Sequence, residues 1–342
     1  MGKKALVVSG GGSKGAFAVG VIKRLARDFP EVDFDIYVGT STGATVVPLA
    51  ALGNIPLLEK LYTSVHTQDI VLAGNVIDRF VNDISIYDAR PLGNLVKQYY
   101  NDENCAALFN SDKEVFLLTT CLQTATAVAW STKEPPILSD YEIKRAANFT
   151  EFRRAIVASA NQPVFMQPVE IREGAVPVRQ YVDGGVREYL GVQIAIDAGA
   201  DEIFAISLSP VQKEDSAIRY TKTFGVLQRT LDIFSEDVGT NDIKIPRLYN
   251  KALRYIAAVK QNMKDDGISE AAIDRYFNVP LYDTFSGKKP IRIHHITPDE
   301  PLGGGPGGLE FNPAKMLAML QKGESKIASY MAGLPNAPDG NV

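Results

Sequence analysis

Short apolar runs alternate with amphipathic segments along the first part of the chain. Ala5–Ser9 is a β-prone run that ends at three glycines, and Ala16–Leu25 then carries apolar residues at helical spacing. A second buried strand is expected over Phe34–Val38, followed by a glycine-flanked turn and a helix over Ala44–Leu52. Two strand–turn–helix units in succession predict parallel strands joined by crossover helices, so the pattern indicates an α/β fold.

The middle of the chain continues this alternation. Helices are expected over Leu57–Phe80, Thr150–Ala160 (with Thr150 as its cap) and Val192–Ala198, and strands over Val115–Leu122, Ala125–Ser131, Gln180–Val182 and Glu202–Ser209. The first two of these strands are close enough in sequence to form a hairpin.

Residues 211–290 break the alternation, because they are expected to be mostly helical and charged. A strand over Ile291–Ile296 and an amphipathic helix capped by Asn312 follow them. We expect one domain over residues 1–335, in which residues 211–290 form an insertion or cap, and a flexible tail over residues 336–342.

The composition is that of an ordinary globular protein. Of the 342 residues, 45% are hydrophobic and 22% are charged, which excludes the disordered, collagen-like and coiled-coil classes. The 36 Lys and Arg residues against 40 Asp and Glu residues give a net charge of −4, which argues against a nucleic-acid partner. Two cysteines supply neither a disulfide framework nor a zinc-ligand cluster. We expect no metal and no other cofactor, and the oligomeric state stays open.

The apolar run Ala5–Val8 is the candidate for a targeting segment near the N-terminus. It is too short for one, because a signal peptide needs at least about 7 apolar residues and a membrane-spanning helix about 20. We expect a cytoplasmic protein and leave peripheral contact with a membrane surface open.

Gly10–Gly15, with the sequence GGGSKG, lies between the first expected strand and the first expected helix. Its spacing fits a dinucleotide-binding turn, in which a helix N-terminus receives a pyrophosphate. Its bare backbone amides also fit an oxyanion hole for acyl transfer. A dinucleotide site needs an acidic residue at the end of the next strand, whereas Asp33 and Asp35 stand at its start.

A serine stands at the end of that strand instead. Gly39–Gly43 has the sequence GTSTG between an expected strand and an expected helix, which is the context of a nucleophile elbow. Gly39 and Gly43 leave room around a strained turn, and the start of the following helix brings a positive dipole end to the serine. Ser41 is therefore the candidate nucleophile.

The base that serves Ser41 has several candidates. Three histidines occur in the chain, namely His66 on the surface of an expected helix and His294 and His295 on opposite faces of an expected strand. None of the three stands in a glycine-rich or acidic loop. Asp183 does, because it ends an expected strand and precedes Gly184 and Gly185. A carboxylate held in hydrogen-bond reach can accept the serine proton, although an ordinary Asp-Gly-Gly turn is the alternative.

Together, these motifs resemble the patatin-like phospholipase family. That family combines a G-G-G-x-[K/R]-G oxyanion loop, a G-x-S-x-G elbow and a later D-G-[G/A] in a Ser–Asp dyad without histidine. The corresponding segments here are Gly10–Gly15, Gly39–Gly43 and Asp183–Gly185, in the same order. With the similar flanks Ala158–Ala160 and Gly199–Ile203, the resemblance covers about residues 4–210.

The resemblance implies a three-layer α/β/α fold with a mainly parallel central sheet, and calcium-independent hydrolysis of lipid or phospholipid acyl esters by a phospholipase A or lysophospholipase. Ser41 would attack the ester and Asp183 would take its proton. The resemblance also implies that the oxyanion hole is formed by Gly10, Gly11 and Gly12. The turns around the site would be supported by Gly15, Gly39, Gly43, Gly184 and Gly185. Lys14 would either support the glycine loop or contact a phosphate. An exposed turn position without a role is the alternative for Lys14.

One departure and three alternative functions accompany the resemblance. Tyr189 and Gly191 stand where the family usually has Asn and then Pro, so we expect the loop beside the aspartate, and with it substrate choice, to differ. The alternatives are a thioesterase or acyltransferase on the same dyad, a nucleotide-binding module that uses only the glycine turn, and a scaffold that presents the helices of residues 211–277. The hydrolase is favoured because it uses all three motifs.

Overall fold

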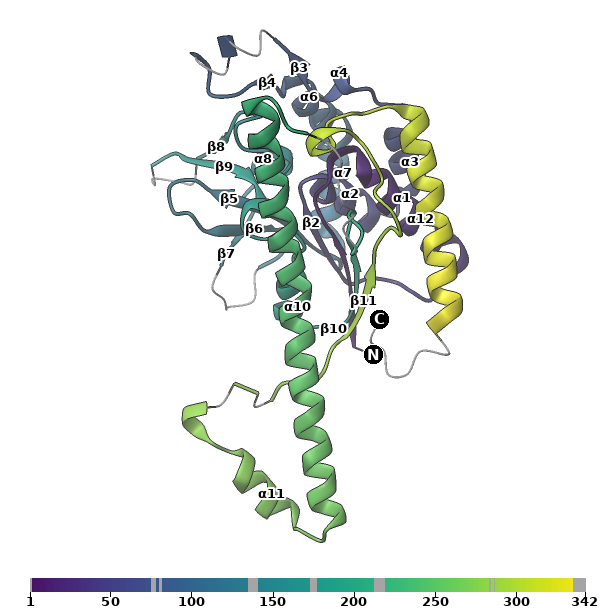
Figure 1. Cartoon of the computed structure of the whole chain (residues 1–342), viewed down its shortest axis with the longest axis vertical. Coiled ribbons are helices and arrows are strands. Elements are labelled where there is room, and N and C mark those ends of the chain that lie inside the picture. Colours follow the sequence, from purple (N-terminus) through teal and green to yellow (C-terminus); the bar gives the residue numbers. More distant parts are fainter. Residues whose placement is uncertain are drawn as a thin grey trace.

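The computed structural model describes residues 2–74, 78–79, 82–134, 141–172, 177–211, 219–282, 284–285 and 287–334. A nine-stranded sheet forms the centre of the molecule (Figure 1). Its strands are β1 (Lys3–Val8), β2 (Ile36–Thr40), β5 (Glu114–Cys121), β6 (Ala127–Ser131), β7 (Glu142–Arg145), β8 (Val169–Ile171), β9 (Arg179–Asp183), β10 (Ala200–Ile206) and β11 (Arg292–Ile296). A separate two-stranded sheet joins β3 (Leu72–Ala73) to β4 (Tyr87–Asp88).

The main path through the sheet runs β11-β10-β1-β2-β5-β6-β7. All neighbours from β11 to β5 are parallel, whereas β6 and β9 both pair antiparallel with β5. The antiparallel β5–β6 pair confirms the expected hairpin. The sheet is thus mainly parallel, as expected.

Helices cover both faces of this sheet. They are α1 (Gly15–Asp28), α2 (Thr42–Ala51), α3 (Ile55–Ser64), α4 (Thr67–Ile70), α6 (Arg90–Tyr99), α7 (Asp102–Asn110), α8 (Phe149–Ala160), α9 (Val192–Asp197), α10 (Thr223–Asp265), α11 (Glu270–Phe277) and α12 (Pro313–Gly333), with short 3-10 turns η1 (Gly12–Lys14), η2 (Gly184–Val186), η3 (Pro280–Tyr282) and η4 (Pro306–Gly308).

Two hydrophobic cores follow from the alternation of side chains along the strands. In β1, Leu6 and Val8 belong to the larger core, which includes side chains of α1, α2, α3, α8 and α12. Ala5 and Val7 point to the smaller core on the other face, which α9 and Ile243 of α10 complete. Strands buried on both faces explain why these segments are continuous apolar runs. The three-layer α/β/α architecture is therefore confirmed.

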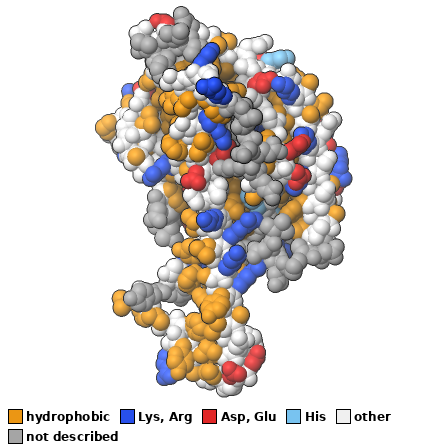
Figure 2. All heavy atoms as spheres, in the orientation of Figure 1, with side chains coloured by type: hydrophobic (Ala, Val, Ile, Leu, Met, Phe, Trp, Pro, Cys, Tyr) orange, Lys and Arg blue, Asp and Glu red, His pale blue; other side chains and the backbone are white. Residues whose placement is uncertain are grey.

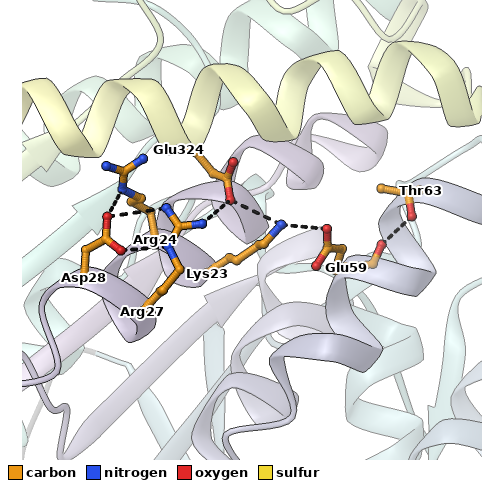
Figure 3. A network of polar contacts seen from close by, with 7 residues as sticks. All are labelled: Lys23, Arg24, Arg27, Asp28, Glu59, Thr63 and Glu324. Atoms are coloured by element: carbon orange, nitrogen blue, oxygen red, sulfur yellow. Dashed lines mark hydrogen bonds and ion pairs between the residues drawn. The ribbon is translucent and has the colours of Figure 1, made fainter.

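The terminal helix α12 packs closely on α1. A Cβ atom on Gly20 would lie 1.9 Å from the Leu320 carbonyl oxygen, and one on Gly323 would lie 2.1 Å from the Phe17 carbonyl oxygen, so both contacts require glycine. Lys23 of α1 bridges Glu324 of α12 and Glu59 of α3 in a network of ion pairs (Figure 3). The apolar face of α12 is thus used in docking, and Asn312 caps the helix by accepting the Lys315 amide at 3.1 Å, as expected.

Two local expectations are wrong. The helix expected over Leu57–Phe80 ends at Ser64, because Val65 and His66 adopt extended backbone angles before the short helix α4 begins. Part of that range, residues 75–77 and residue 80, lies outside the described residues. The cap of α8 is Asn148, whose side chain accepts the Glu151 amide at 2.9 Å, whereas Thr150 lies inside the helix.

The 43-residue helix α10 begins beside the body of the protein and extends well beyond the sheet, where α11 lies alongside it (Figure 1). Figure 2 shows hydrophobic side chains gathered on this arm, and the exposed ones include Leu248, Tyr255, Tyr276 and Leu281. The expected helical segment after residue 211 is present, although residues 212–218 and the expected tail at 336–342 lie outside the described residues. Among the described helices, none combines the length and apolarity needed to cross a membrane.

Candidate active site

Two strands that run toward each other bring Ser41 and Asp183 together. The parallel strand β2 ends with Thr40 opposite Leu118 of β5, and the antiparallel strand β9 ends with Asp183 opposite Thr119, the next residue of β5. Because β6 occupies the other edge of β5, β2 and β9 share one edge and their C-terminal ends meet there. Residues 142 positions apart in the sequence thereby become neighbours.

The turn after β2 holds Ser41 in a strained backbone conformation. Its φ of 56° and ψ of −122° lie where residues other than glycine are rare. Gly39 and Gly43 make this turn possible, because a Cβ on Gly39 would be 2.4 Å from the Gly43 carbonyl oxygen and one on Gly43 would be 2.1 Å from the Val8 carbonyl oxygen. The amide of Ser41 donates to the hydroxyl oxygen of Ser159 on α8 at 2.9 Å, which anchors the turn to the core.

The Ser41 hydroxyl lies close enough to the Asp183 carboxylate to lower the pKa of that carboxyl, and both side chains line one cavity. The same carboxylate accepts the Gly185 amide at 2.8 Å, and the Asp183 amide donates to the Asn161 carbonyl at 2.9 Å. Burial raises the pKa of Asp183 to about 6, against the opposing effects of the Ser41 hydroxyl and the Gly185 amide. A carboxylate of this kind is a stronger base than an exposed one and is still ionised near neutral pH.

The glycine turn places backbone amides beside Ser41. A Cβ on Gly10 would lie 3.0 Å from the Ser41 Cβ, which shows how closely the turn approaches the serine. Gly11 and Gly12 have φ values of 150° and 57°, and their amides pair with no acceptor among the described residues. The Gly11 carbonyl accepts the Lys14 amide at 3.2 Å, which fixes the peptide plane between Gly11 and Gly12.

Tyr189 links the glycine turn, the Asp-Gly-Gly motif and helix α10. Its ring lies within contact of Gly10, Gly185 and Gly239, where a Cβ would come to 2.9, 2.8 and 2.7 Å from ring atoms respectively. Its hydroxyl donates to the Gly10 carbonyl, and its amide donates to the Asp242 carboxylate of α10 at 2.9 Å. The sequence marks Tyr189 as a departure from the family pattern, but the partnership with Asp242 has no local sequence signal.

Two cavities meet at Ser41. The first has a volume of about 800 Å³, mouth included, and its walls are mostly apolar side chains of α3, α6 and the loop after η4; they include Leu61, Val65, Leu92, Leu95, Val96 and Phe311. The second has a volume of about 860 Å³ and is more polar, with Asp183, Lys14, Arg229, Asp232, Ser235 and Glu236 among its lining residues. The nucleophile candidate is therefore open to an apolar space on one side and a charged space on the other.

Lys14 is less exposed than a lysine in a surface turn would be. Lys14 is half-buried and lines the polar cavity, so it is not an exposed turn residue. Burial lowers the pKa of Lys14, while Asp232 and Glu236 oppose that effect.

The three histidines lie away from Ser41. His66 is exposed at the start of α4, and His294 pairs with Glu202 of β10 at 2.8 Å. His295 is half-buried on β11 rather than in solvent, and burial lowers its pKa to about 4. None of the three lines either cavity described above. Within the described part of the chain, no group of three or more His, Cys, Asp or Glu side chains is placed to hold a metal ion.

Comparison with known proteins identifies the family. The model of the patatin-like phospholipase family matches residues 6–196, which is more than half of the chain. The chain belongs to the patatin-like phospholipase family. Its expected fold and its general activity as a lipid acyl hydrolase follow from that membership. The matched range contains the glycine turn, the elbow and the Asp-Gly-Gly motif, whereas α10 lies beyond it.

The remaining comparisons add little. No curated protein matches the sequence. A similar solved structure is VipD from Legionella pneumophila, with 11% identity, a TM-score of 0.44, and coverage of 97% of this chain and 67% of that one. The assignment to the family rests on the sequence model alone.

Proposed function

We propose that the protein is a serine lipid acyl hydrolase of the phospholipase A or lysophospholipase type, which acts through an acyl-Ser41 intermediate. The observation that carries the proposal is the close approach of Ser41, on its strained turn, to the buried carboxylate of Asp183. Family membership supplies the general chemistry, and the two cavities supply space for the two ends of a lipid.

In the first half of the reaction, the Ser41 hydroxyl oxygen attacks the ester carbonyl carbon and its proton passes to the Asp183 carboxylate. The carbonyl oxygen becomes an oxyanion, which the free amides of Gly11 and Gly12 stabilise. As the tetrahedral intermediate collapses, the bond to the alcohol oxygen breaks and that oxygen takes the proton from Asp183. An acyl ester on Ser41 and a free alcohol result.

In the second half, water attacks the acyl-Ser41 carbonyl carbon and gives a proton to Asp183. Collapse of the second tetrahedral intermediate breaks the bond to the Ser41 oxygen, which recovers the proton from Asp183. A fatty acid leaves and the free enzyme is restored. Each step uses groups of this chain and water, so the proposal includes independence from calcium.

The substrate assignment rests on the two cavities. An acyl chain fits the apolar cavity, because its lining of leucine, valine and phenylalanine side chains replaces water around the methylene groups. The alcohol side of the ester then faces the polar cavity. Lipids of this kind are aggregated in water, and the exposed apolar side chains on the arm formed by α10 and α11 support peripheral contact of the protein with such aggregates.

A fluorophosphonate probe followed by peptide mass spectrometry tests the proposal, together with p-nitrophenyl esters of rising chain length. We expect the probe on Ser41, hydrolysis of the medium and long esters, and loss of both in Ser41→Ala. Ser64→Ala, at the exposed end of α3, is the matched control and keeps both. Turnover by Ser41→Ala at the parent rate would contradict the proposal. Preference for an acyl thioester over every oxygen ester tested would favour a thioesterase instead.

A further inference from the structure

The polar cavity contains four charged side chains that the hydrolytic steps do not use. Lys14 comes from the glycine turn, and Arg229, Asp232 and Glu236 come from the first half of α10. Spaced at i, i+3 and i+7, the last three lie on one face of the helix. All four line the same cavity as Ser41 and Asp183, so they surround the alcohol side of a bound ester.

Of the two cations among these four side chains, Lys14 is the one without a salt bridge to another described residue. Arg229 and Glu236 pair at 3.3 Å, and the amide of Gly307 is near enough to Asp232 to lower the pKa of that carboxyl. Among the described residues, no carboxylate makes an ion pair with the Lys14 ammonium, although Asp232 and Glu236 are near enough to act on its pKa. A half-buried ammonium without a salt bridge carries a desolvation cost that an anionic ligand would offset.

The balance of charge restricts the ligand. Besides the carboxylate of Asp183, the cavity holds two cations and two anions, so a purely anionic group would meet Asp232 and Glu236 as well as Lys14 and Arg229. A phosphodiester carrying an amine satisfies both pairs. Arg229 forms planar bidentate contacts with phosphate oxygens, and carboxylates pair with an ammonium group.

We propose that this face of α10, together with Lys14, is a head-group site for zwitterionic phospholipids, with the phosphate at Lys14 and Arg229 and the amine at Asp232 and Glu236. The inference rests on the hydrolase function proposed above and names its preferred substrate class. Lys14 lies within the range matched by the family model, whereas the three charged residues of α10 lie outside it.

Three lipids with identical acyl chains test the head-group site, namely phosphatidylcholine, phosphatidylglycerol and diacylglycerol, each in mixed micelles with a neutral detergent. We expect the parent to have its highest kcat/KM on phosphatidylcholine. In Arg229→Gln, kcat/KM on phosphatidylcholine should fall about tenfold more than on diacylglycerol, since a charge-assisted contact is lost. Arg229→Lys should recover part of that preference.

Glu236→Gln tests the other half of the site. It removes one negative charge without loss of size, so the ratio of kcat/KM for phosphatidylglycerol over phosphatidylcholine should rise. Lys244→Gln, on the exposed surface of the same helix, is the control and should leave every ratio as in the parent.

Equal losses on all three lipids in Arg229→Gln, or no preference of the parent for phosphatidylcholine, would overturn the head-group site. Probe labelling of Ser41 in the same samples separates the two proposals. Labelled protein without head-group preference refutes only the site on α10, whereas unlabelled protein that hydrolyses none of the lipids refutes the hydrolase itself. If Arg229→Gln does not fold, Arg229→Lys and Glu236→Gln still decide the outcome through the same ratios.

Discussion

The hydroxyl group of Tyr189 donates a hydrogen bond to the carbonyl oxygen of Gly10 across 2.7 Å. In a trans peptide, the carbonyl of one residue and the N–H of the next point in opposite directions. A donor that holds the Gly10 carbonyl on one side therefore aims the Gly11 amide toward the other. Tyr189 stands where the family usually has asparagine, so this chain orients its glycine turn with a longer side chain.

Tyr189→Phe is expected to lower kcat by about fivefold to tenfold and to change KM little. The phenyl ring retains the packing against Gly10 and Gly185, and only a hydrogen bond with a net worth of about 1 kcal/mol is lost. Steady-state kinetics on a p-nitrophenyl ester measure the effect. Tyr255→Phe, an exposed tyrosine on the arm, is the control. A change in KM with kcat intact would show that Tyr189 contacts substrate instead of positioning the turn.

Ser41→Ala and Asp183→Asn should each reduce kcat by several orders of magnitude, because residues that act as one unit fail together. The asparagine amide keeps the size of the side chain but cannot accept the serine proton. Rates of ester hydrolysis and of probe labelling, measured on variants with parent-like circular dichroism, check the expectation.

The same prediction assigns the histidines no part in proton transfer. Replacement of His66, His294 and His295 by glutamine should leave kcat within about tenfold of the parent, with any loss due to packing. An essential histidine, combined with a mild Asp183→Asn variant, would replace the dyad by a conventional triad.

The rate should depend on pH through Asp183. Its pKa is raised to about 6, and only the ionised carboxylate accepts the proton from Ser41. Activity is therefore expected to be full above that value and to fall about tenfold for each pH unit below it. A profile of kcat/KM against pH measures the midpoint. A midpoint near 4, the value of an exposed aspartate, would show that Asp183 is not the buried base.

Activity should persist in excess EDTA. The proposed steps need a carboxylate, a hydroxyl and two backbone amides, and none of these depends on a cation. Initial rates before and after chelation, and after addition of calcium or magnesium, provide the measurement. Loss of activity that one metal ion restores would reveal a metal requirement.

Leu95→Trp should shift the preferred acyl chain to shorter lengths. Leu95 is half-buried on the wall of the apolar cavity, so an indole ring there would occupy space that the distal methylene groups use. Relative kcat/KM over a series of p-nitrophenyl esters measures the shift. Leu317→Trp, at an exposed position on α12, should keep the parent optimum. An unchanged optimum in Leu95→Trp would place the acyl chain elsewhere.

The motifs and most elements follow from the sequence because their causes are local. A strand such as β1 contains a continuous apolar run. The turn that holds Ser41 needs glycine at positions 39 and 43, because a Cβ atom at either position would clash with backbone atoms. The end of helix α3 at Ser64 does not follow from the sequence pattern. Apolar residues continue at helical spacing through Val65, and nothing in that spacing reveals that the backbone there is extended.

Only the tertiary structure decided which distant groups meet. Ser41 lies beside Asp183 because β2 and β9 end at consecutive residues of β5, and a register of that kind depends on pairing across the whole sheet. The position of α10 is likewise fixed by contacts such as Asp242 with the Tyr189 amide, from segments 53 residues apart. Local spacing contains no information about such contacts, because their partners are selected by the packing of the complete fold.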